Sequence, residues 1–144
     1  MGVRGYLLGA MWLTLGCVGC TAPTQVEMVA VEPFGWSESR SVIVNNDDTL
    51  SLRRIAVALR YNSDFEGATL PLRIVTSSPN ALYMEEQVTL PIARPYSASV
   101  VAVTEEITYR YNARLSQRGN YIFTITPLET VKGVEAVGVI LQNE

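Results

Sequence analysis

The most reactive side chains of this 144-residue chain are two cysteines three positions apart, Cys17 and Cys20. Each follows a glycine, and both come after an apolar run over residues 6–16 that a single basic residue, Arg4, precedes. A basic residue followed by a short apolar run is typical of an export signal, and this run is well under the ~20 residues needed to span a bilayer. A small residue before the cysteine suits a lipoprotein peptidase, so the sequence predicts a lipid-modified thiol.

Cys20 is the favoured lipidation site, with Cys17 as the alternative. An ordinary secretory signal, or a disulfide between the two cysteines, would also fit the spacing. Cleavage before Cys20 would define a lipoprotein signal peptide over residues 1–19, a lipidated cysteine with a short tether over residues 20–25, and one domain over residues 26–144. Palmitate and the other acyl chains of such a cysteine hold a protein firmly on a membrane, because two or more chains suffice where one is marginal.

The composition excludes several classes of chemistry. The chain has no histidine, fourteen acidic residues and eleven basic ones, of which only Lys132 is a lysine. Without histidine, Ser-His and Cys-His nucleophile pairs cannot form, and a metal site would have to be built from carboxylates. An acidic balance also argues against nucleic acid, which requires a basic surface. We therefore expect no catalytic residue, no cofactor, no metal and no nucleic acid partner.

Acidic residues in pairs are the remaining candidates for catalysis or ion binding: Asp47-Asp48, Glu85-Glu86 and Glu105-Glu106. Adjacent side chains on a strand point to opposite faces, so the glutamate pairs cannot converge on one substrate atom. They are expected to be solvated strand ends. Residues 45–49 lack the alternating ligands of a calcium loop. A turn held by Asx hydrogen bonds is the preferred interpretation.

Short alternating segments separated by turn residues, with no sustained helical period, predict an all-β fold. The clearest strands are expected over residues 55–61, 70–76, 107–115, 121–126 and 137–141, and fainter ones over residues 26–31, 41–44, 87–92 and 99–103. Gly119 is expected to supply a positive φ in the loop before residues 121–126. Eight or nine such strands indicate a single antiparallel β-sandwich domain of jelly-roll type.

Aromatic and arginine side chains are the candidates for partner contacts. Tyr109, Tyr111 and Tyr121 share the apolar register of their strands and are expected in the core, and Trp36 is expected to plug one end of the sandwich. Phe65, in a polar loop, is the aromatic expected at the surface. Three arginines, Arg60, Arg110 and Arg114, would share a polar sheet face if their strands were neighbours, and that face would suit an acidic partner.

Several segments of this sequence, in the same order and behind a lipoprotein signal, match a known family. They are Pro33-Phe34-Gly35-Trp36, Asp48-Thr49-Leu50, Leu59-Arg60-Tyr61-Asn62, residues 70–74, and the closing segments 119–127 and 131–139. In these parts the chain resembles the gliding motility lipoprotein GldH family. The resemblance implies a β-sandwich lipoprotein of the cell envelope, associated with the gliding machinery and its secretion system, and it does not imply an enzyme.

The sequence thus predicts a membrane-anchored, non-catalytic envelope protein that acts through protein partners. Residues 21–25 lack an acidic cluster of the kind that directs many lipoproteins to the cell surface, so we expect the domain to face the periplasm. The alternative is an accessory glycan-binding lipoprotein, which the sandwich and its tyrosines suggest.

Overall fold

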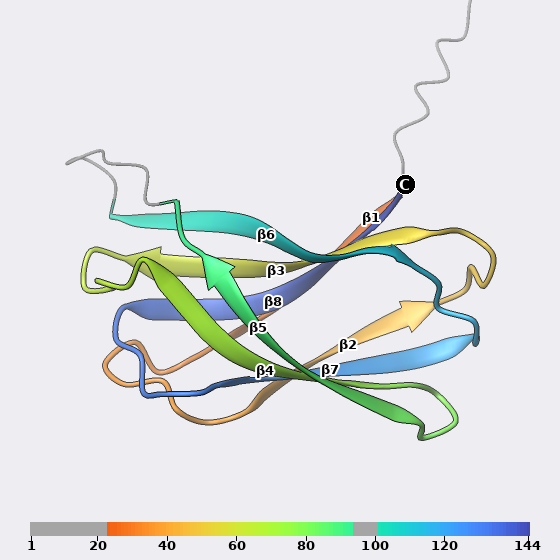
Figure 1. Ribbon diagram of the computed structural model, residues 1–144, viewed down its shortest axis with the longest axis horizontal. Coiled ribbons are helices and arrows are strands. Elements are labelled where there is room, and N and C mark those ends of the chain that lie inside the picture. The colour runs from red at the N-terminus through yellow and green to blue at the C-terminus, as the bar shows by residue number, and fades with distance from the viewer. Residues whose placement is uncertain (1–22, 94–100) are drawn as a thin grey trace, which may run out of the picture.

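In the computed structural model the strands pair in a nested order: the first described strand pairs with the last, and each later strand pairs with the next one inward (Figure 1). The structure describes residues 23–93 and 101–144, and these form eight strands and no helix. The strands are β1 (Thr24–Ala30), β2 (Arg40–Asn46), β3 (Arg53–Asn62), β4 (Thr69–Ser77), β5 (Tyr83–Pro91), β6 (Ala102–Ala113), β7 (Gly119–Pro127) and β8 (Val134–Asn143).

The two sheets have the strand orders β1-β8-β3-β6 and β2-β7-β4-β5, with every pair antiparallel. The first strand therefore pairs with the eighth, the second with the seventh, the third with the sixth and the fourth with the fifth. A long hairpin rolled up in this way is the jelly roll, and the predicted all-β, antiparallel jelly-roll sandwich is confirmed.

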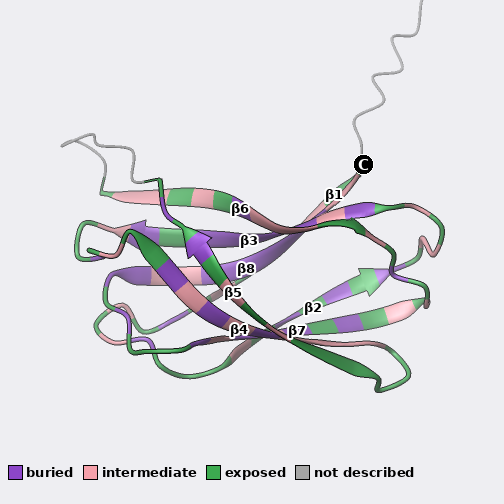
Figure 2. Cartoon of the chain, viewed as in Figure 1, coloured by how far each residue is buried: buried purple, intermediate pink, exposed green. Residues whose placement is uncertain are grey.

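The core lies between the two sheets and follows the alternation of the strands (Figure 2). In β7, the inward Phe123 and Ile125 are fully buried while Thr124 and Thr126 are more accessible. Strands β3 and β8 lie inside their sheet and are apolar on both faces, as the run over residues 137–141 predicted for a central strand. Ala56, Ala58 and Ile140 form a second small buried cluster on the outer face of that sheet.

Two differences between the predicted and the observed strands alter the organisation of the domain. Strand β1 begins at Thr24, so Thr24 and Gln25 belong to the domain rather than to a tether, because β8 extends far enough to pair with both. Residues 102–103 and 107–113, predicted as parts of two strands, belong to one strand, β6, which begins at Ala102; residues 99 and 100 of the first prediction lie outside the described residues.

The pairing of β6 with β3 has register shifts near Ile55, where Tyr109 is an extra residue, and Asn112 adopts a φ of 53°. Each extra residue changes which face the following side chains occupy. Tyr111 is consequently 64% exposed, and its predicted place in the core is wrong, whereas Tyr121 is buried as predicted. Gly119 has the predicted positive φ, at 120°.

The antiparallel strands place their connections at two opposite ends of the sandwich (Figure 1). At one end, which we call the pocket end, lie residues 31–39, 63–68 and 128–133. At the other end, which we call the termini end, lie residues 47–52, 78–82 and 114–118, together with Thr24 and Glu144. Pro23 and the last residues of the chain are neighbours there, since the Asn143 amide donates to the Pro23 carbonyl at 3.3 Å, and the Glu144 amide donates to the Leu52 carbonyl at 3.0 Å.

Gly138 provides a test of how β1 is attached to the sandwich. A Cβ at this position would lie 2.0 Å from the Glu27 carbonyl oxygen and 2.7 Å from the Met28 Cα, both of them backbone atoms of β1. We expect Gly138→Ala to push β1 away from β8 and to lower the free energy of unfolding by about 1–3 kcal/mol or more. Urea unfolding followed by tryptophan fluorescence measures the loss.

Gly35→Ala is the matched control, because the nearest atom to its added Cβ is the Thr130 methyl carbon at 3.5 Å, an ordinary contact. It should change the free energy of unfolding by no more than about 0.5 kcal/mol. Equal losses in the two variants would show that the close approach of β1 to Gly138 does not govern stability.

Candidate functional site

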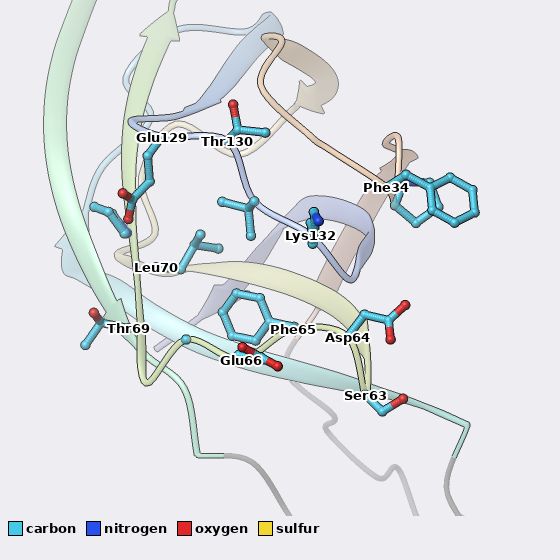
Figure 3. A pocket seen from close by; sticks show the side chains of 14 residues that line it. Phe34, Ser63, Asp64, Phe65, Glu66, Thr69, Leu70, Glu129, Thr130 and Lys132 are labelled. Carbon is cyan, nitrogen blue, oxygen red and sulfur yellow. The ribbon is translucent and has the colours of Figure 1, made fainter.

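A groove of about 700 Å³ opens at the pocket end of the sandwich. One wall is the β3–β4 connection, the other is the β7–β8 connection, and the turn with Pro33 and Phe34 stands beside them (Figure 3). The lining is mixed, with Phe65, Leu70 and Val131 as apolar surface and charged side chains at the rim. It is therefore a recess built by three connections that are far apart in the sequence.

Phe34 is the most exposed aromatic side chain at this end, with 82% of its surface accessible. The turn that carries it is held by backbone hydrogen bonds, from the Gly35 amide to the Glu32 carbonyl (3.2 Å) and from the Gly133 amide to the Pro33 carbonyl (2.8 Å). Phe34 is consequently presented to solvent on a backbone that is already ordered.

Trp36, two residues further on, fixes this turn to the rest of the molecule. Its backbone exchanges two hydrogen bonds with Val131, at 2.8 and 2.9 Å, and its indole N–H donates to the Glu38 carbonyl at 2.7 Å. Its side chain is 1% exposed, so the prediction that Trp36 plugs one end of the sandwich is confirmed. Sequence analysis identified this anchor but missed its exposed neighbour Phe34, whose Pro-Phe-Gly setting was the available signal.

Phe65 forms the floor of the groove, and its predicted exposure is wrong. The side chain is 4% exposed and packs on Tyr61 with ring centroids 5.4 Å apart. The polar residues around it are satisfied within their own turn, since the Asn62 side chain accepts from the Asp64 amide at 2.9 Å. Gly133 lets the neighbouring loop approach, because a Cβ there would lie 2.1 Å from the Phe65 nitrogen. A polar loop can thus carry a buried ring when a glycine opposes it.

Four charged side chains surround the groove: Asp64, Glu66, Glu129 and Lys132. All four are exposed, and Figure 3 shows them coming from both walls. Three carboxylates against one ammonium give the rim an acidic balance. Electrostatics of this kind favour a partner with basic or hydrogen-bond-donating groups.

The three arginines predicted to share one face are separated by the fold. Arg60 points outward from β3, is 51% exposed in its side chain, and pairs with Glu135 of β8 at 3.0 Å. Arg110 pairs instead with Glu86 of β5, across the gap between the two sheets. Arg114 is exposed beyond the end of β6, at the termini end. The bulges of β6 are the reason, since they turn Arg110 inward, and the predicted common arginine face does not exist.

The glutamate pairs do not converge, as predicted, but none of the four glutamates lies at a strand end, and Glu106 pairs with Arg54 at 3.7 Å. Glu86 is bound to Arg110. Glu105 accepts the Tyr61 hydroxyl at 2.8 Å and the Ala93 amide at 3.0 Å. Both lie in the middle of a strand near the open β5–β6 edge. Burial of the Tyr109 side chain at this edge is the main cause that raises its pKa, and the negative charge of Glu86 raises it further.

Asp48 forms the predicted Asx turn. Its Oδ1 accepts from the amides of Leu50 and Ser51, at 3.0 Å each. Hydrogen bonds from the Ser51 side chain and then from the two amides lower the pKa of Asp48. No group of three or more Asp, Glu, Cys or His side chains is arranged to hold a metal ion in residues 23–93 and 101–144. Asp48 acts in a turn, and the carboxylates in ion pairs are those of Glu38, Glu86, Glu106 and Glu135 in the described residues.

The lipidation candidates Cys17 and Cys20 lie outside the described residues. In the part that the structure does describe, no helix is both long and apolar enough to cross a bilayer.

No protein-family model and no curated protein matches this chain. A structure of infectious bursal disease virus, Gx strain, is similar to 93% of this chain at 10% identity with a TM-score of 0.41. The chain spans about a third of that viral chain, 36% of its length. The Yersinia pseudotuberculosis-derived mitogen is similar to 86% of this chain and 88% of its own, at 10% identity and a TM-score of 0.37.

The lowered pKa of Asp48 predicts a specific loss of stability in acid. A carboxyl group whose folded-state pKa is depressed stabilises the fold above its unfolded-state pKa of about 3.9, and that contribution disappears as the pH falls through the lower folded value. Asp48→Asn should therefore unfold at a lower urea midpoint than the parent at neutral pH, and the difference should shrink as the pH falls below about 4. Urea melts at a series of pH values measure it.

Asp47→Asn makes the same change in charge one residue away, without altering the oxygen that accepts the turn amides. It should leave the acid branch of the parent profile unchanged. If Asp47→Asn and Asp48→Asn gave parallel profiles, net charge rather than the Asx turn would be responsible.

Proposed function

We propose that this protein is a lipid-anchored, non-catalytic component of the bacterial cell envelope that acts by binding another protein at its pocket end. The observation that carries the proposal is Phe34, an exposed ring held on a rigid turn beside an acidic groove. The cysteine motif of residues 17–20 supports the lipid anchor, and the absence of histidine supports a role without catalysis.

An exposed aromatic side chain on an ordered backbone is a favourable contact residue. Aromatic rings dominate binding hot spots, and a backbone that is already ordered loses little entropy on association. The Phe34 turn meets both conditions, since Trp36 and Val131 hold it in place. The rim carboxylates Asp64, Glu66 and Glu129 would then select a partner whose surface is basic around an apolar recess.

The sequence resemblance to the GldH family supports placing this role in the gliding motility machinery and its associated secretion system. The lack of an acidic cluster after Cys20 supports a domain that faces the periplasm. In this proposal the partners are other envelope proteins, and the protein contributes contacts to their assembly.

Site-specific photocrosslinking tests the protein contact. A photoreactive phenylalanine analogue at position 34 of the full chain, expressed in the native host, should give a crosslink to a defined envelope protein. The same analogue at Ile43, which is 56% exposed on the outer face of β2, is the matched control and should give none. Mass spectrometry of the isolated protein should show an acylated N-terminal Cys20.

Two outcomes would contradict the proposal separately. An unmodified N-terminus would show that the protein has no lipid anchor. Equal crosslinking from positions 34 and 43 would show that the pocket end is not the contact surface. In the second case Phe34→Ala would also leave the assembly of the complex intact.

The second candidate is binding of a glycan in the same groove, and it is favoured by the exposed Phe34 ring beside carboxylate and hydroxyl groups. A sugar-binding recess combines an apolar surface with a few polar groups that fix orientation. Affinity electrophoresis in gels that contain envelope polysaccharides decides the matter. Retardation that Phe34→Ala abolishes and Ile43→Ala leaves intact would support the glycan; unretarded migration in every gel would remove this candidate.

A further inference from the structure

Among the large apolar side chains that lie outside the pocket end, most of the strongly exposed ones are at the termini end of the sandwich. Its exposed fractions are 79% for Leu50, 66% for Leu82, 76% for Tyr83 and 64% for Tyr111. Leu52 and Met84 add to the same region, with 40% and 44%. We call these six residues the end-face cluster. These six exposed apolar side chains lie on or next to the connections at one end of the sandwich. Such a concentration of exposed apolar side chains indicates a surface that another phase or molecule covers.

Hydrogen bonds hold the connections that carry this cluster against one another. The Asn46 side chain, at the end of β2, donates to the Leu115 and Gln117 carbonyls at 2.9 and 2.8 Å. The Gln117 side chain in turn accepts the Asn80 amide at 3.2 Å, which joins the β4–β5 turn to the β6–β7 connection. The connections that carry the end-face cluster are therefore linked to one another at this end of the sandwich (Figures 1 and 2).

The chain enters the domain at this same end, because β1 begins at Thr24 beside Asn143 and Glu144. Thr24 follows Cys20 by four positions, and a fully extended chain over that separation reaches at most about 14 Å. A lipid on Cys20 would consequently keep the termini end close to the bilayer surface. The pocket end would lie beyond the length of a strand, about 30 Å for ten residues, on the side away from the membrane.

We infer that the end-face cluster contacts the lipid bilayer and sets the orientation of the domain on the membrane. Leucine side chains suit the boundary of the acyl region, and tyrosine is enriched where membrane meets water. The inference rests on the lipid anchor of the proposed function. It adds a second, non-covalent contact that holds the groove and Phe34 toward the envelope partner.

The charged side chains at this end indicate whether the contact with the bilayer is electrostatic or apolar. Arg114 and Arg118 lie in the β6–β7 connection, while Asp47 and Asp48 lie in the neighbouring β2–β3 connection. The two signs offset each other, so anionic headgroups gain little net attraction. The contact is therefore apolar, and it should persist at high salt, where an electrostatic contact is screened.

Tryptophan quenching by brominated lipids tests the orientation. The full-length lipidated protein is reconstituted into phosphatidylcholine vesicles with bromine on the acyl chains, as the variants Leu50→Trp, Leu82→Trp and Phe34→Trp. We expect the emission added by Leu50→Trp and Leu82→Trp to be mostly lost, at low and at high salt alike. Phe34→Trp is the matched control, exposed to a similar extent at the other end, and its added emission should remain.

Mass spectrometry of the same preparations separates this inference from the proposed function. An acylated protein on vesicles whose Leu50→Trp and Leu82→Trp emission is unquenched overturns the end-face contact and leaves the lipid anchor standing. Quenching that disappears at high salt overturns the apolar contact. Unquenched but blue-shifted emission that reverts on dilution assigns the cluster to a second copy of the chain and also overturns the inference.

Discussion

The pairing of the first strand with the last is the constraint on which the rest of this structure depends. β1 lies directly against β8, and the contact is close enough that Gly138 has no room for a Cβ beneath Glu27 and Met28. Once β1 and β8 are paired, the nested pairs β2–β7, β3–β6 and β4–β5 follow in turn. Both chain ends are thereby brought to one end of the sandwich, and the connections alternate between the two ends.

This alternation explains how connections from distant parts of the chain come together at one end of the sandwich. Residues 31–39, 63–68 and 128–133 converge at the pocket end although they are widely spaced in the chain. Their backbones are tied together by the Trp36–Val131 pair and by hydrogen bonds from Gly133 to Pro33 and from Asn62 to Gly133. The groove therefore lies at the end of the sandwich opposite Thr24, where β1 begins.

Local alternation was enough to predict much of the fold, and it failed where a residue is inserted in a strand. The period of two placed most of the buried residues of β3, β4, β7 and β8 correctly, because these strands pair on both sides and the register shifts of β3 lie toward its two ends. In β6 the extra residues near Tyr109 and Asn112 invert the facing, which exposed Tyr111 and turned Arg110 toward Glu86. A bulge is a feature of two paired strands, so the sequence pattern of β6 alone does not show where the extra residues lie.

The same distinction applies to the candidate site. Trp36 was identifiable because a tryptophan in a Pro/Gly turn needs a buried place, and burial is what its size predicts. Phe34 and Phe65 both sit among polar or turn residues, yet Phe34 is exposed and Phe65 is buried. The Pro-Phe-Gly setting was a local signal for Phe34, whereas Phe65 could not be assigned from its own neighbourhood. The difference lies in what the β7–β8 connection offers them. Gly133 opens a place over Phe65, and the bond from Gly133 to the Pro33 carbonyl holds Phe34 outside it. The close approach of Gly133 to the Phe65 backbone thus accompanies the burial of Phe65 as the floor of the groove, while Phe34 stays exposed beside it.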